Sequence, residues 1–110
     1  MNPAVYHIVI NQNATFSKTF QLKGGDGTPL NMTGYTVEAE VWTRNKTKKL
    51  ADFSVTWVDR LVGKFTISLS AAQTALIESE GYWDMLITEP SGTKDYWLRG
   101  RAGFALGYTE

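Results

Sequence analysis

The sequence predicts an all-β protein that folds as two antiparallel sheets packed face to face. Apolar-rich segments alternate with turn signals roughly every 8–15 residues, a spacing typical of sandwiches and barrels. Aromatic residues make up 13% of the chain and include four tryptophans, which supply bulk for a core. We therefore expect about seven strands and one short helix near residues 70–79.

The expected strands follow one another with short connections. In chain order they are residues 5–10, 14–22, 35–42, 53–57, 65–69, 82–87 and 95–106. The segment 35–42 is the clearest, because its apolar and polar residues alternate strictly, with Tyr35, Val37, Ala39 and Val41 on one side. Successive side chains of a strand point to opposite faces, so these four residues predict one buried face.

The same two-residue period supports the other strands. One face of the second strand carries Ala14, Phe16, Phe20 and Leu22, although Lys18 interrupts the pattern. Three later strands each have an inward set, namely Phe53, Val55 and Trp57, then Phe65, Ile67 and Leu69, then Trp83, Met85 and Ile87. In the last strand, Gly100 and Gly103 indicate a bulge or a close approach of backbones.

Turn residues separate these strands. The segment 23–29 is rich in glycine and ends in proline, so it predicts a turn. Residues 44–49 form a polar loop between two strands, and residues 89–93 form a second turn. These breaks give each strand a defined end and favour antiparallel neighbours.

One segment departs from the β pattern and predicts a short helix. Ser70 is placed to cap its first turn, and Gln73 follows three residues later, as in a capping box. Leu76 and Ile77 are expected to hold the helix across one end of the sandwich, and Gly81 to end it. A helix of about ten residues needs this packing, because it is too short to be stable alone.

Composition bounds the classes of function. A chain of 110 residues and 12.3 kDa fits one domain, residues 1–110. Eleven basic and eleven acidic residues cancel, which gives no general reason to expect nucleic acid or a membrane as the partner. The chain has no cysteine, and its first residues lack the basic and apolar regions of a signal peptide. No stretch is long and apolar enough to span a membrane.

The sequence offers little for catalysis. His7 lies in an apolar-rich strand without an acidic neighbour in sequence, so we expect a packed or edge histidine. Glu38 and Glu40 share a strand face, but the polar face of an antiparallel sheet normally carries such residues. We expect no catalytic, cofactor-binding or metal-binding residue, and no cofactor.

Two features indicate a contact surface instead. The loop 44–49 is basic, with its charges on Arg44, Lys46, Lys48 and Lys49. It is either a solvated loop or a contact to phosphate or to an acidic patch on another protein. The loop has no interleaved aromatic residue, so base stacking is not indicated and nucleic acid is not the expected partner.

The second feature is a group of apolar side chains on outward faces. Trp42 shares the face of Glu38 and Glu40, and Tyr82 and Leu86 lie opposite the inward residues of their strand. Such residues are either partly buried under loops, or contacts to a protein, or a platform for stacking a sugar. Trp42, Tyr82 and Leu86 are therefore candidate contact residues.

Three stretches carry a resemblance to a known family. They are LKGGDGTPLNMTGYTV at residues 22–37, GKFTISLS at 63–70 and GYWDMLI at 81–87. Together they resemble the immunoglobulin-like domains of tailed-phage virion proteins, such as the N-terminal domain of phage baseplate upper proteins. The resemblance covers residues 14–106 and involves turns and core positions, so it implies an immunoglobulin-like β-sandwich without catalytic residues.

The resemblance also implies a function. It leads us to expect a non-enzymatic virion protein, made in the host cytoplasm, that docks on other phage virion proteins in multiple copies within a symmetric assembly. A tail, baseplate or fibre-junction subunit is the first interpretation. The alternatives are a capsid decoration protein and a carbohydrate-binding or adhesion module for a host glycan.

Overall fold

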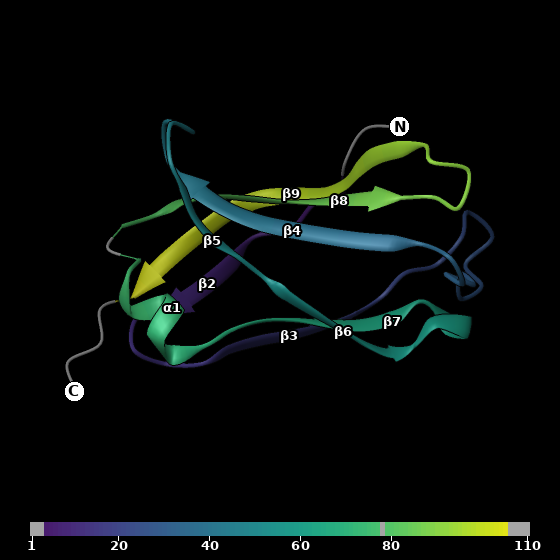
Figure 1. The fold of residues 1–110 in the computed structure, drawn as a ribbon, viewed down its shortest axis with the longest axis horizontal. Coiled ribbons are helices and arrows are strands. Elements are labelled where there is room, and N and C mark those ends of the chain that lie inside the picture. The colour runs from purple at the N-terminus through teal and green to yellow at the C-terminus, as the bar shows by residue number, and fades with distance from the viewer. Residues whose placement is uncertain (1–3, 78, 106–110) are drawn as a thin grey trace.

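The computed structural model describes residues 4–77 and 79–105, which form a β-sandwich of two layers (Figure 1). The strands are β1 (Ala4–Val5), β2 (Ile8–Asn11), β3 (Phe16–Gln21), β4 (Thr36–Thr43), β5 (Lys49–Asp52), β6 (Ser54–Asp59), β7 (Lys64–Leu69), β8 (Gly81–Thr88) and β9 (Lys94–Ala105). A 3-10 helix, η1 (Arg60–Val62), precedes β7, and the helix α1 (Ala71–Ala75) follows it. The predicted all-β sandwich is confirmed.

The two sheets have the connectivity of an immunoglobulin-like sandwich. The larger sheet has the order β1–β9–β8–β4–β5, with β2 also paired to β9, and the smaller has the order β3–β7–β6. Neighbours are antiparallel except β1 and β2, which run parallel to β9. The described residues hold nine strands rather than about seven, because the first divides around Tyr6 and His7, and β5 forms where part of a loop was expected.

The core lies between the sheets and contains the predicted inward residues. The alternating residues of β4 and β8 are buried, with Trp83 at the centre and 2% exposed. Its ring stacks on Phe20 at 6.1 Å between ring centroids, and its indole Nε1 donates a hydrogen bond to the carbonyl oxygen of Tyr6 at 2.7 Å. Lys18 belongs to the inward side of β3, and its Nζ lies 5.6 Å from the centre of the Tyr6 ring.

The N-terminal strands approach β9 closely at one point. A Cβ atom at Gly100 would overlap the carbonyl oxygen of Tyr6, so only glycine allows this spacing. A Cβ atom at Gly103 would meet its nearest atom, the carbonyl oxygen of Ile8, at an ordinary 3.5 Å. The expected close approach is confirmed at Gly100, whereas the bulge of β9 lies in its pairing with β8, opposite the Met85–Leu86 step.

The helix is confirmed but shorter than expected. The Ser70 hydroxyl accepts from the Gln73 amide, and the Gln73 side chain accepts from the Ser70 amide, which completes the capping box. The helix ends at the Leu76 cap instead of near residue 79, because Ile77 turns into the core and is 2% exposed. The prediction that Leu76 also packs is wrong, since it is 73% exposed. Gly81 opens β8 rather than ending the helix.

Candidate functional site

The outer face of the larger sheet carries the side chains of β4, β8 and β9 that point away from the core. The strand register aligns them in three rows across the sheet. The first row is Trp42, Tyr82 and Arg101, the second is Glu40, Asp84 and Arg99, and the third is Glu38, Leu86 and Tyr96. This face is therefore mixed, with aromatic, acidic and cationic groups side by side.

The first two rows, apart from Glu40, form the floor of a groove of about 910 Å³, which we call the outer groove. The loop after β4 closes one side, and β9 with the segment around His7 closes the other. Its cationic lining residues are Arg44, Lys46, Arg99 and Arg101, and its aromatic residues on the outer face are Trp42, Tyr82 and Tyr96. The volume is within the usual range for binding sites of roughly 300–1,000 Å³.

The cations of the outer groove are not neutralised by carboxylates in the described part of the chain. The ion pairs found there both involve Lys49, which lies 3.4 Å from Glu40 and 3.1 Å from Asp52. The four groove cations face one lining carboxylate, that of Asp84. The groove is therefore positively charged although the whole chain has a formal net charge of zero.

One cation is held against an aromatic ring. The Nζ of Lys46 lies 5.3 Å from the centre of the Tyr82 ring, within the range of a cation–π contact. This contact brings the loop after β4 down onto the sheet and covers part of the Tyr82 ring. Lys46 itself is at positive φ, 59°, a conformation that the tight turn at this position requires.

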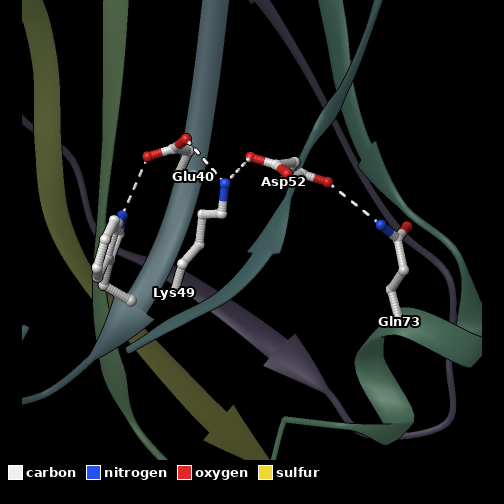
Figure 2. A network of polar contacts seen from close by, with 5 residues as sticks. Glu40, Lys49, Asp52 and Gln73 are labelled. Atoms are coloured by element: carbon white, nitrogen blue, oxygen red, sulfur yellow. Dashed lines mark hydrogen bonds and ion pairs between the residues drawn. The ribbon is translucent and has the colours of Figure 1, made fainter. Parts of the chain in front are cut away.

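A polar network fixes the β4 edge of the groove, which forms one wall together with the loop after β4 (Figure 2). The Trp42 indole Nε1 donates to Glu40 Oε1 at 3.1 Å, and the other oxygen of Glu40 accepts from Lys49 at 3.4 Å. Asp52 extends the network to α1, because its backbone carbonyl accepts from the Gln73 side chain at 3.3 Å. The Trp42 indole is therefore held by Glu40 of β4, and Glu40 is held in turn by Lys49 of β5.

Asp84 lies in the floor of the groove and is half-buried. Its pKa is raised above the ordinary aspartate value, first because burial disfavours the charged carboxylate and second because the Glu40 carboxylate is near. Lys46 acts in the opposite direction and lowers the pKa of Asp84. The net effect is that the Asp84 carboxyl is protonated more readily than an ordinary aspartate, although the Lys46 ammonium group is near.

His7 lies at the rim, between β1 and β2, and is exposed. Its Nδ1 accepts a hydrogen bond from the backbone amide of Arg101 at 2.9 Å, so the ring joins the N-terminal segment to β9. The expected edge histidine is confirmed. The bond assigns the proton of the neutral ring to Nε2.

The structure brings together four of the seven predicted contact residues. Trp42, Tyr82, Arg44 and Lys46 line the outer groove. The other three, Leu86, Lys48 and Lys49, lie beside the groove rather than in its lining. Leu86 is half-buried in the third row, Lys48 is exposed in the loop, and Lys49 begins β5 and pairs with Glu40 and Asp52.

Sequence reasoning missed the cations of β9. Arg99 and Arg101 flank Gly100 and share a strand face, and this spacing of two is a signal that the sequence does contain. Tyr96 had no such signal. It reaches the outer face through the bulge, which adds one residue to β9 between the partners of Met85 and Leu86.

Within residues 4–77 and 79–105, three or more histidine or carboxylate side chains do not gather into a group that could hold a metal ion. In the same part of the chain, neither helix has the length and apolar character needed to cross a membrane.

Comparisons with known proteins agree with this architecture. The model of the LtfC-like, β-sandwich domain family matches residues 2–103. Among solved structures, the crystal structure of the Lin-41 filamin domain has a TM-score of 0.51 at 17% sequence identity, and the match covers 90% of this chain and 84% of that one. At this identity the likeness concerns the fold alone. No curated protein matches the chain in sequence.

Proposed function

Because this chain belongs to the family of LtfC-like β-sandwich domains, we propose that it is a non-enzymatic structural subunit of a bacteriophage tail. The association of this family with phage tails supports a place in the tail rather than elsewhere in the virion. In this proposal the protein acts by docking on neighbouring virion proteins, at the baseplate or at a fibre junction. The resemblance of residues 14–106 to baseplate upper proteins supports the baseplate as one place of docking.

The observation that carries the docking role is the convergence of contact residues in the outer groove. Trp42, Tyr82, Arg44 and Lys46 come from two strands and a loop and lie around one hollow. Tryptophan, tyrosine and arginine are the residue types most enriched at the energetic centres of protein interfaces. A surface of this composition is suited to protein recognition.

The polar groups of the groove wall are engaged in structural bonds, which supports a non-enzymatic role. The Glu40 carboxylate holds both Trp42 and Lys49, and the His7 Nδ1 accepts from a backbone amide. A general base needs a free lone pair directed at a substrate. The lone pairs of Glu40 and of His7 Nδ1 are therefore used within the protein, which leaves Asp84 as the lining carboxylate outside these bonds.

Repetition would make a modest interface sufficient. Virion parts are symmetric assemblies in which one patch is used in every copy. Several weak contacts of this kind combine to a strong attachment when geometry allows them to form together. A single groove therefore need not bind its partner tightly for the protein to be attached stably in a tail.

The test is quantitative mass spectrometry of purified virions of the phage that encodes the chain. We expect the chain in the tail fraction after heads and tails are separated, in a fixed ratio to other tail proteins. An R99E/R101E variant should be depleted from particles, whereas Lys64→Glu, on the smaller sheet, should enter normally. Absence of the unaltered chain from virions overturns the proposal, and its presence in the head fraction alone assigns it to capsid decoration.

A second candidate is binding of a glycan in the same groove. Trp42 and the 47% exposed Tyr96 lie near the Asp84 carboxylate, and aromatic faces with acceptors suit sugars. The contact of Lys46 with the Tyr82 ring counts against it, since it occupies one stacking surface. A glycan array with the wild type and Trp42→Ala tests this candidate: binding that needs Trp42 supports it, and absence of binding removes it.

A further inference from the structure

We propose that the outer groove receives an extended acidic segment of a neighbouring protein, with carboxylates at alternate positions that pair with Arg99 and Arg101. This inference rests on the proposed docking function and names the chemistry of the partner. The occupant is a strand-like peptide rich in aspartate or glutamate. Charge, spacing and the state of the aromatic rings each support it.

The charge of the groove calls for an anionic occupant. Arg44, Lys46, Arg99 and Arg101 face the single lining carboxylate of Asp84, which leaves an excess of three positive charges. Among the described residues, none of these four cations lies within 4.0 Å of a carboxylate. Complementary charge across an interface sets both the partner and the speed of association.

The spacing of the arginines favours an extended peptide. Arg99 and Arg101 are two residues apart on one face of β9, so their Cα atoms are separated by roughly 6.6–6.8 Å. A peptide in the same extended conformation places its residues i and i+2 on one face at the same interval. Each guanidinium can then take one carboxylate in a bidentate pair.

The opposite wall can hold the same segment from its other side. Arg44 and Lys46 lie in the loop after β4, and the first row of the sheet places Tyr82 between this loop and Arg101. The groove thus has cations on two sides and aromatic rings between them. Acidic side chains on either side of a peptide would meet a cation, while its apolar atoms would lie on the rings.

The rings themselves favour a peptide over a saccharide. Lys46 lies over the Tyr82 ring, and the Trp42 indole donor is used by Glu40. One stacking surface and one hydrogen-bond donor that a sugar would use are thus already occupied. Tyr96 stays available as an aromatic surface, but Arg99 and Arg101 are the groups best suited to recognition, because arginine binds a carboxylate in a plane with two hydrogen bonds.

The experiment is an NMR titration of the ¹⁵N-labelled full chain with capped nine-residue peptides. One peptide alternates serine and glutamate, SESESESES, and a matched peptide of the same composition, EESSSEESS, has no two glutamates at positions i and i+2. We expect shifts at the Trp42 indole N–H and in β8, β9 and the loop after β4 with the alternating peptide. The affinity should fall about tenfold between 50 and 300 mM salt, because the contacts are ionic.

Variants separate the groove from general charge. R99Q/R101Q should weaken binding of the alternating peptide at least tenfold, whereas Lys64→Gln, an exposed cation of β7, should leave it unchanged. Thermal unfolding of each variant shows that the fold is retained. Equal affinity for the two peptides would overturn the proposal that carboxylates at alternate positions are recognised. Binding that R99Q/R101Q does not weaken would overturn the assignment of the site to Arg99 and Arg101.

A third probe distinguishes the other class of occupant. A hyaluronan hexasaccharide carries carboxylates on sugars, and tighter binding of this probe than of the alternating peptide in the groove would overturn the peptide proposal. The result is independent of the tail role. If the chain binds the peptide but is absent from virions, the acidic-segment site stands and the proposed function is overturned. If the chain is present in virions but does not bind the peptide, the proposed function stands and the acidic-segment site is overturned.

Discussion

The outer faces of the two sheets carry different chemistry, although both belong to one sandwich. On the smaller sheet, the register aligns short hydroxyl side chains in two rows across three strands. One row is Ser17, Ser68 and Ser54, and the other is Thr19, Thr66 and Thr56. The larger sheet instead carries long charged and aromatic side chains, and these surround the outer groove.

The difference shows what makes a sheet face into a site. Alternation along strands exposes one face of each sheet in the same way. On the smaller sheet, short hydroxyl groups bond to each other across strands, as Thr19 and Thr66 do with 2.8 Å between the two Oγ1 atoms. Long side chains, a loop held by Lys46 and an added N-terminal strand give the larger sheet walls.

The largest expected effect concerns the N-terminal wall of the larger sheet. Gly100→Ala should lower the free energy of unfolding by about 2–3 kcal/mol, because the new Cβ overlaps the Tyr6 carbonyl and the backbones must move apart. Gly103→Ala, on the same strand, meets only ordinary contacts and serves as the control. Urea denaturation measures both variants, and equal losses would contradict the close approach at Gly100.

A smaller effect is expected from the tryptophan of the groove wall. Trp42→Ala should cost about 1–2 kcal/mol, since it removes a half-buried ring and the hydrogen bond to Glu40. Trp42→Phe retains most of the ring area and should cost less than half as much. If both variants unfold at the wild-type urea midpoint, the network around Glu40 contributes nothing and the wall is not fixed.

The charge of the groove floor predicts a pH dependence. The folded state raises the pKa of Asp84, so its ionisation opposes folding, and this cost grows as pH rises from the ordinary aspartate pKa of about 3.9 through the raised value. Asp84→Asn should therefore be more stable than the wild type at pH 7, by less than about 1 kcal/mol because the group is only half-buried.

The same difference should vanish near pH 3, where the carboxyl is protonated in both states. Urea denaturation of both proteins across this range measures it. Glu40→Gln provides the second check: removal of the nearby carboxylate should lower the pKa of Asp84, as followed by NMR of its carboxyl carbon. An advantage of Asp84→Asn that grows toward acid pH would reverse the sign and refute the assignment.

The smallest effect is expected on the smaller sheet. Thr66→Val removes the hydroxyl that pairs with Thr19 on a solvent-facing surface and should change stability by no more than about 0.5 kcal/mol. The same variant should leave binding in the outer groove unaltered. A loss of stability as large as that of Trp42→Ala would mean that the outer faces of the two sheets contribute equally to stability.

The fold was largely predictable because its signals are local. The alternation of Val37, Ala39 and Val41 fixes the inward face of β4, and the same parity places Trp42 outward, as the structure confirms. Ser70 and Gln73 mark the helix start through hydrogen bonds within one turn. Such patterns act over two to four residues, which is the range that a single sequence reveals.

The groove was only half predictable because its β9 wall depends on long-range pairing. The bulge opposite Met85 and Leu86 adds one residue to β9, so the outward positions shift from even to odd residue numbers across it. Tyr96 therefore lies on the same face as Arg99 and Arg101. Simple alternation cannot place all three on one face. The parallel pairing of the N-terminal strands with β9 joins residues far apart in sequence and leaves no local mark.

That parallel pairing has a mechanical consequence. The backbone hydrogen bonds that join β1 and β2 to β9 lie across the strand direction, over six registered residue pairs from Ala4 with Leu98 to Asn11 with Ala105. Opposite forces on the start of β1 and the end of β9 would slide these parallel strands lengthwise, so the bonds would be loaded in shear and break together rather than one by one. This geometry resists a pull between Ala4 and Ala105 better than a pairing whose bonds open one after another.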